Sequence, residues 1–125
     1  MGKFVVKKSK NDGYVFNLKA TNGQVIATSQ VYSSEATCNN GIESVRKNAA
    51  AAGIEDQTKE GFETLKHPKF EVYADKAGEF RFRLTATNGQ IIVTGQGYKH
   101  HADVLNGIDS IKRNAPEATI VKEDE

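Results

Sequence analysis

The chain has 125 residues, of which 38% are hydrophobic and 26% are charged, and its formal net charge is +1. This length suits one compact domain, and no apolar run approaches the length needed to cross a bilayer. The nearly neutral balance excludes a global attraction to nucleic acid or to an anionic membrane. The lysines that directly follow Met1–Val6 leave no room for the apolar core of a signal peptide, so we expect a cytoplasmic protein.

The sequence contains an internal duplication. The segment from Lys3 to Ala49 aligns without a gap on the segment from Lys69 to Ala115, so each position pairs with the one 66 residues further on. A copy of this size has only a marginal hydrophobic core of its own. We therefore expect one pseudo-twofold domain, with repeats at 3–54 and 69–121, a linker at 55–68 and an acidic tail at 122–125.

Three strands open each repeat. The middle strand alternates apolar and polar residues, which is typical of a half-buried strand. Asn22-Gly23 and Asn88-Gly89 follow it and favour a two-residue type I′ turn into a β-branched third strand. The predicted strands are 4–6, 14–20 and 25–28 in the first copy, and 70–73, 80–86 and 91–94 in the second.

A helix follows the strands of each copy. Its apolar residues recur on one helical face, at Cys38, Ile42, Val45 and Ala49 and at the matching Val104, Ile108, Ile111 and Ala115. Ser33 or Ser34 can cap the first helix, which extends towards Gly53, and Pro116 ends the second. The segment 119–121 is compatible with a short closing strand.

An interior glycine, Gly41 or Gly107, lies in each predicted helix, where glycine costs about 1 kcal/mol relative to alanine. Close approach of another backbone explains both glycines, either because the two helices cross near the pseudo-dyad or because each helix packs tightly on a strand. Inheritance from an ancestral single repeat is the alternative explanation.

The motifs of the two copies carry a family resemblance. They are Ala20–Gln24, Thr28–Ser34 and Asn40–Asn48 in the first copy, and Thr94–Tyr98 and Asn106–Asn114 in the second. In these motifs the chain closely resembles the YegP-like family of small bacterial proteins.

The resemblance implies an α+β fold, a tandem duplication of a β-β-β-α(-β) unit with antiparallel sheets packed against two helices. It also implies an unknown function, a loose association with stress conditions and no accepted catalytic residues. Single-copy relatives are expected to form homodimers, so the tandem chain is predicted to be a monomer, the covalent version of such a dimer.

The hairpin register assigns the strand residues to two faces of the sheet. It pairs Leu18 with Ala27 and Leu84 with Val93 on the inner face. It pairs Asn17 with Thr28, Val15 with Gln30, Arg83 with Thr94 and Arg81 with Gln96 on the outer face. The candidate binding surface on the outer face consists of Lys19, Thr28, Gln30, Arg81, Arg83, Thr94 and Gln96. A merely solvated sheet face is the alternative.

Basic residues near the helix carboxyl ends are candidate phosphate contacts: Arg46, Lys47, Lys112 and Arg113. Cations at these positions also complement the helix macrodipole, which is sufficient reason for their presence. A nucleic-acid-binding function lacks the support of a strongly basic composition or of an aromatic ribonucleoprotein signature.

Other reactive side chains have ordinary explanations. Cys38 matches Val104 in the second repeat and is expected to be a small core hydrophobe. His100 and His101 are adjacent, so on a helix their side chains point about 100° apart and form a poor chelate. We expect both histidines to be exposed to solvent.

The sequence therefore predicts no catalytic residue, no metal and no cofactor. Glu43 and Asp109 lie four residues before Lys47 and Arg113, a spacing typical of helix salt bridges. The favoured function is non-catalytic binding of a protein or small ligand through the exposed sheet face. The alternatives are weak nucleic-acid binding through the basic residues, and a small enzyme with an unrecognised site.

Overall fold

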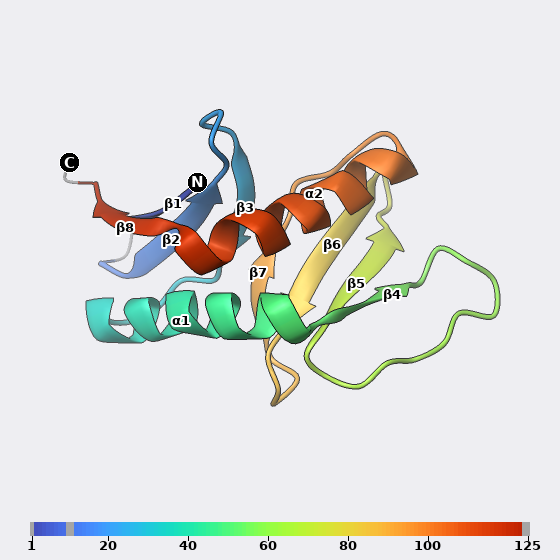
Figure 1. The fold of residues 1–125 in the computed structure, drawn as a ribbon, viewed down its shortest axis with the longest axis horizontal. Helices are drawn as coiled ribbons and strands as arrows, with labels where there is room; N and C mark the ends of the chain where they lie inside the picture. The colour runs from blue at the N-terminus through green and yellow to red at the C-terminus, as the bar shows by residue number, and fades with distance from the viewer. Residues whose placement is uncertain (1, 10–11, 124–125) are drawn as a thin grey trace.

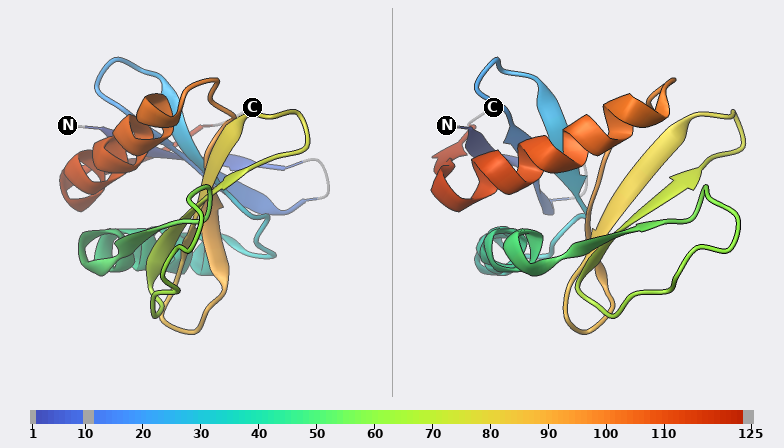
Figure 2. Two further views of the ribbon diagram at one scale, coloured as in Figure 1. Left: turned by 90° about the vertical axis from the view of Figure 1, so that its right-hand side faces the viewer. Right: turned by 45° about the vertical axis from the view of Figure 1, so that its right-hand side comes forward.

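The computed structural model describes residues 2–9 and 12–123, which form one sheet with two long helices on one of its faces (Figure 1). The strongly twisted sheet and the helix layer are seen from two further sides in Figure 2. In chain order the elements are β1 Lys3–Lys8, β2 Tyr14–Lys19, β3 Val25–Ser29, α1 Glu35–Ala51, β4 Gly53–Asp56, β5 Lys69–Ala74, β6 Phe80–Thr85, β7 Ile91–Thr94, α2 His101–Asn114, a 3₁₀ turn at Ala115–Glu117, and β8 Thr119–Lys122.

The two repeats share a single sheet with the strand order β4-β5-β6-β7-β3-β2-β1-β8. The three antiparallel strands of each repeat meet at β3 and β7, where Thr28 lies opposite Thr94. These two threonines are equivalent positions of the duplication, so the pseudo-twofold axis passes between them. The fold is thus α+β as predicted, and the antiparallel strands of the two repeats form one continuous sheet.

Each repeat contributes its last strand to the other repeat. After α1, β4 pairs in parallel with β5 of the second repeat, and after α2, β8 pairs in parallel with β1 of the first. Figure 1 shows β4 and β8 at opposite edges of the sheet. The closing strand expected at 119–121 is confirmed as part of β8.

This exchange corrects the expected boundaries. Glu55 and Asp56, predicted to begin the linker, belong to β4, because their backbone pairs with β5. Lys122, predicted to begin the tail, belongs to β8, and the amide of Glu123 donates to the carbonyl of Val6 (2.8 Å). The remaining tail residues, Asp124 and Glu125, lie outside the described residues.

The core lies between the sheet and the two helices. Four phenylalanines, Phe4, Phe16, Phe70 and Phe82, have no exposed surface, and the predicted apolar helix faces pack on them. Cys38 is fully buried as expected, and burial raises the pKa of its thiol to about 11. Among the described residues, no helix is long and apolar enough to span a membrane.

The hairpin turns differ from the type I′ prediction. Gly23 and Gly89 have positive φ angles, but the asparagines before them do not. The amide of Gly23 donates to the carbonyl of Ala20 and the amide of Ala20 donates to that of Gln24, so the loop has three residues. A shift after Leu18 then restores the register.

The inner and outer pairs nearest the turns therefore form as predicted: Asn17–Thr28, Leu18–Ala27, Arg83–Thr94 and Leu84–Val93. The predicted pairing of Val15 with Gln30 and of Arg81 with Gln96 is wrong. The ladder shifts by one residue there, and isolated bridges join Tyr14 to Tyr32 and Phe80 to Tyr98.

The helix ends follow from their caps. Ser34 caps α1 in a capping box with Thr37, as one of the two predicted serines. The helix ends at Ala51, and Gly53 starts β4 instead of closing the helix. The second helix ends at Asn114, directly before the turn that contains Pro116.

The interior glycines make room for tyrosines of their own repeats. A Cβ atom on Gly41 would lie 2.2 Å from the hydroxyl oxygen of Tyr32, and one on Gly107 would lie 2.7 Å from that of Tyr98. The predicted close approach of a backbone, from the other helix or from a strand, is therefore wrong: the group that approaches each glycine is a tyrosine side chain. The ring of Tyr32 also stacks on Phe16, with centroids 6.2 Å apart.

Candidate functional site

The face of the sheet opposite the helices carries a row of cross-strand neighbours that spans all its strands. From β4 to β8 the row reads Glu55, Glu71, Arg83, Thr94, Thr28, Asn17, Val5 and Val121. The two halves of this row are equivalent in the duplication but differ in chemistry. In the half formed by β4, β5, β6 and β7, three of the four residues are charged (Glu55, Glu71 and Arg83), whereas all four residues in the half formed by β3, β2, β1 and β8 are neutral.

The charged half is an internally neutralised network. Lys69 is 4% exposed and lies 2.7 Å from a carboxylate oxygen of Glu55 and 3.3 Å from one of Glu71. Arg83 binds Glu71 from the other side (2.5 Å). Two cations thus face two carboxylates, and no charge in the group lacks an opposite neighbour.

The network fixes the ionisation of Glu55. Burial alone would raise the pKa of this carboxyl, but hydrogen bonds from Lys69, Gln57 and the amide of Leu65 outweigh burial and lower it to about 2. Because Leu65 belongs to the long loop before β5, this hydrogen bond also fixes that loop to β4. The network of Lys69, Glu55, Glu71 and Arg83 therefore has a structural role, because its charges are already paired with one another.

The arginines of the predicted binding surface are already engaged. Arg83 binds Glu71, and its guanidinium lies 4.7 Å from the ring centroid of Tyr73. Arg81 binds Asp75 at 2.6 Å. Both lie on the predicted face, but each charge is compensated by a neighbour.

The other half of the outer face, formed by β3, β2, β1 and β8, carries two lysines that have no ion pair with the described residues. Lys3 lies directly opposite Lys19 on β1 and β2, and neither has an ion pair or a side-chain hydrogen bond within the described part of the chain. Val15, Val25 and Val121 lie on the same face, the last two 39% and 41% exposed. We call these five residues the lysine–valine surface. The equivalent of Lys3 in the second repeat is Lys69, which two carboxylates neutralise.

The remaining predicted surface residues fall into two groups. Thr28 and Thr94 lie at the centre of the outer face, and the Thr28 hydroxyl donates to Asn17 (3.0 Å). Gln30 and Gln96 do not join the row, because the ladder shifts by one residue there and the next bridges are Tyr14–Tyr32 and Phe80–Tyr98. Burial raises the pKa of Tyr32 and Tyr98, and a hydrogen bond with Gln30 or Gln96, respectively, partly offsets the rise.

Two of the four predicted phosphate contacts are structural instead. Arg46 donates to the carbonyl of Ala118 (2.5 Å), and Lys112 donates to that of Ala52 (2.6 Å). Each carbonyl directly precedes an exchanged strand, so these equivalent cations hold β8 and β4 in place. Each also lies 5.5 Å from the centroid of a core phenylalanine ring.

The other two predicted contacts are exposed. Arg113 binds Asp109 (2.8 Å), as the spacing predicts, whereas Glu43 pairs with Arg46 (2.9 Å) and not with Lys47. The expected macrodipole role holds for the second helix only. The first helix extends to Ala51, beyond the basic pair, and its last turn contains no basic residue.

The histidine pair is divided between two environments. His101 is half-buried and its Nε2 atom lies 2.6 Å from Asp56, which corrects the expectation of two exposed histidines. Burial alone would raise the pKa of Asp56, but hydrogen bonds from Thr58 and His101 lower it. Among residues 2–9 and 12–123, no group of three or more His, Cys, Asp or Glu side chains could hold a metal ion.

The pair of His101 and Asp56 has an equivalent in the other repeat, in which the carboxylate lies on the helix instead of on the strand. There, Glu35 at the start of α1 binds Lys122 of β8. Both pairs join the start of a helix to a strand received from the other repeat. Pairing of two copies of the first repeat would instead bring Glu35 near a carboxylate, so the charges favour association of unlike repeats.

Comparison with known proteins places this arrangement in a family. The family described as "Domain of unknown function (DUF1508)" matches residues 9–56 and again residues 75–121. The chain belongs to this family. Its two matches coincide with the two repeats, and the resemblance noted from the motifs is thereby confirmed.

Relatives include both tandem and single-copy proteins. The UPF0339 protein PA0329 of Pseudomonas aeruginosa is 39% identical over 121 residues, which cover 97% of this chain and 96% of that protein. The UPF0339 protein Atu5359 of Agrobacterium fabrum is 60% identical over 53 residues, which cover 42% of this chain but 86% of that protein. The second relative therefore corresponds to one repeat.

A solved relative has the same fold. The solution structure of the protein of unknown function yegP from E. coli is 32% identical, with a TM-score of 0.80 over 98% of this chain and 92% of that one. The function of the family is unknown, and none of these relatives is named for an activity.

Proposed function

We propose that the protein is a non-catalytic binding module whose lysine–valine surface binds an acidic protein segment. The observation that carries this proposal is Lys3 directly opposite Lys19 on neighbouring strands. Like charges in this position destabilise a sheet. No carboxylate among the described residues pairs with either lysine, although the equivalent Lys69 has two carboxylate partners. An acidic partner would supply the missing counter-charge.

The apolar residues of the surface favour a protein partner over a nucleic acid. Exposed valines beside lysines resemble the apolar centre and polar rim of protein interfaces. Single-stranded nucleic acids require aromatic platforms for their bases, and Tyr73, on the outer face of the other half, already lies against Arg83. Electrostatic complementarity would then guide the acidic segment to the exposed valines.

The non-catalytic part of the proposal is supported by the state of the carboxyl groups. Burial alone would raise the pKa values of Glu55, Asp56 and Glu71, but hydrogen bonds from neighbouring groups lower all three. A general acid or base works best when its pKa lies near the operating pH. The Cys38 thiol is also a poor nucleophile, because burial raises its pKa to about 11.

The proposal is tested with a fluorescein-labelled peptide of alternating Glu and Val, measured by fluorescence anisotropy at low salt. We expect Lys3→Glu/Lys19→Glu to weaken binding by about tenfold or more, because two attractive charges become repulsive. The matched control is Lys59→Glu/Lys76→Glu, which changes the net charge equally at two exposed lysines. This control is expected to bind within about twofold of the wild type, since net charge mainly alters long-range attraction.

Two results would contradict the proposal. Equal weakening by both double variants would mean that only net charge matters. Tighter binding of a single-stranded oligonucleotide of the same charge, lost in Lys3→Glu/Lys19→Glu, would assign the surface to nucleic acid instead. The cytoplasmic location, the association with stress conditions and the monomeric state stay predictions; light scattering of the purified protein tests the last.

A further inference from the structure

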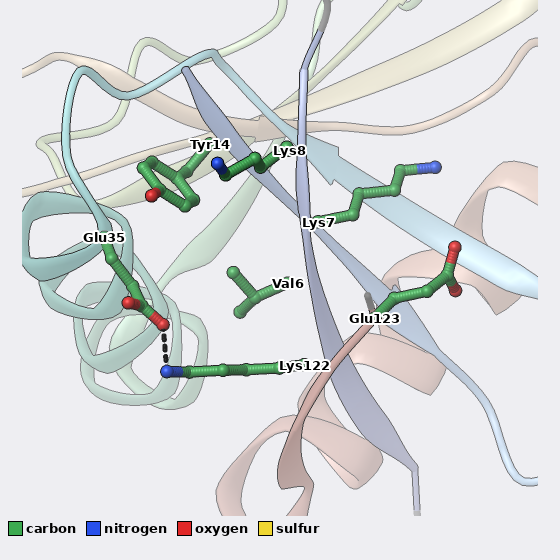
Figure 3. A pocket seen from close by; sticks show the side chains of 7 residues that line it. All are labelled: Val6, Lys7, Lys8, Tyr14, Glu35, Lys122 and Glu123. Carbon is green, nitrogen blue, oxygen red and sulfur yellow. Dashed lines mark ion pairs between the residues drawn. The ribbon is translucent and has the colours of Figure 1, made fainter. Parts of the chain in front are cut away.

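A pocket of about 430 Å³ opens at one end of the first repeat, between the ends of β1 and β8, the start of β2 and the start of α1 (Figure 3). Val6, Lys8, Tyr14, Glu35 and Lys122 line it, with Lys7 and Glu123 at its rim. In Figure 3, Lys8 and Tyr14 lie on one side of Val6 and the ion pair of Glu35 with Lys122 lies on another. A volume of this size is typical of sites for small organic molecules.

The equivalent place in the second repeat is filled. There, Phe80 replaces Tyr14 and His101 replaces Glu35, and their rings meet edge to face with centroids 5.5 Å apart. His101 is also held by Asp56, at 2.6 Å. Ala74 stands in the place of Lys8. The same backbone framework thus carries a ring pair at one end of the molecule and a lined pocket at the other.

The open pocket offers free donors above an apolar floor. Lys8 and Tyr14 are cross-strand neighbours, and their side chains form no hydrogen bond or ion pair with the described residues. Val6 is only 3% exposed and forms the floor. An ammonium and a phenol hydroxyl that act together can hold a carboxylate, while the valine and the tyrosine ring can contact an apolar group.

We propose that this pocket binds a small aromatic carboxylate. The carboxylate would accept hydrogen bonds from Lys8 and Tyr14, and the aromatic ring would lie over Val6. The lining contains three lysines, Lys7, Lys8 and Lys122, against two glutamates, Glu35 and Glu123, which leaves a charge of +1. That balance suits a monoanion better than a phosphate ester with two negative charges.

Titration with benzoate, followed by amide chemical shifts in ¹H–¹⁵N spectra, tests this proposal on the full chain. We expect saturable shifts at Val6, Lys8, Tyr14 and Glu35, with a dissociation constant in the millimolar range for so small a probe. Benzamide has the same shape without the charge, and we expect its affinity to be lower than that of benzoate by about tenfold or more.

Two variants introduce the residues that the second repeat has at the equivalent positions. Lys8→Ala installs the alanine of the second repeat and is expected to weaken benzoate binding by about tenfold, because a charge-assisted hydrogen bond is lost. Tyr14→Phe is expected to weaken it severalfold. Lys99→Ala removes an exposed lysine elsewhere and is expected to leave affinity unchanged. Unperturbed amide shifts away from the pocket confirm that each variant is folded.

Non-saturating shifts scattered over the surface, or equal affinities of Lys8→Ala and the wild type, would overturn the assignment. The variant Lys3→Glu/Lys19→Glu separates this pocket from the lysine–valine surface. It should lose the acidic peptide and keep benzoate, so either proposal can fail without the other.

Discussion

Substitution of the two interior helix glycines by alanine tests the tyrosine packing inside one molecule. In a helix interior alanine is favoured over glycine by about 1 kcal/mol. Against this gain, an added Cβ would lie 2.2 Å from the Tyr32 hydroxyl at Gly41, but 2.7 Å from the Tyr98 hydroxyl at Gly107. Overpacking of a well-filled site typically costs about 1–3 kcal/mol. We expect Gly41→Ala to be destabilised by about 1–2 kcal/mol and Gly107→Ala to be nearly neutral.

Removal of the hydroxyls separates the overlap from other effects. Once Tyr98 is phenylalanine, the ring carbon Cζ at 3.3 Å is the nearest atom to a Cβ at Gly107. Gly107→Ala should then stabilise the Tyr98→Phe background by up to about 1 kcal/mol. Cζ of Tyr32 lies 2.6 Å from a Cβ at Gly41, so Tyr32→Phe should rescue Gly41→Ala only in part.

Urea unfolding, monitored by circular dichroism, measures the free energy of unfolding of the wild type, the two single variants and the double variant of each double-mutant cycle. Each phenylalanine variant serves as its own reference, so loss of the glutamine hydrogen bond cancels. Stabilisation of the wild type by Gly41→Ala, by the full helix-propensity gain, would refute the argument. That result would show that the Tyr32 ring moves aside at no cost and that the glycine is merely inherited.

Two further predictions concern charges. The pKa of Glu55 is lowered from 4.5 to about 2 in the folded protein, so its stabilising contribution is present above pH 4.5 and is lost as the pH falls towards 2. Glu55→Gln should therefore reduce the slope of the free energy of unfolding against pH in this range by up to about 1.4 kcal/mol per pH unit. Unfolding at several pH values measures this slope. Glu35→Lys places two lysines together and should lower the free energy of unfolding by up to about 1 kcal/mol. Addition of Lys122→Glu to the same chain should restore the lost stability. Additive losses in the double variant would show that the ion pair contributes nothing.

The repeated elements could be predicted because their signals are local. Alternation over 14–20 and the helical spacing of Cys38, Ile42 and Val45 each report which side of one element is apolar, and the structure buries those sides. The duplication then doubled the evidence for every element. Even the turn error did not harm the register, since the three-residue loop and the shift after Leu18 compensate each other.

The strand exchange could not be predicted because its causes are not local. Gly53–Asp56 forms β4 by pairing its backbone with a strand that begins at Lys69, and a polar segment gives no sign of that partner. The β-branched residues of 119–121 predicted a closing strand, but they gave no sign of which repeat that strand would join. For the same reason Arg46 and Lys112 resembled free cations, whereas the structure gives each of them a carbonyl that precedes an exchanged strand.

The duplication also locates function by comparison of equivalent positions. Ancestral equivalence means that the two halves began with the same outer face and the same helix-start environment. In the second repeat, Lys69 is neutralised and His101 is packed against Phe80, so both places are closed. In the first repeat, Lys3 has no counter-charge among residues 2–9 and 12–123, and Tyr14 borders an open pocket. Stability alone would favour the closed form in both halves, so the open features of the first repeat are where selection for binding is to be sought.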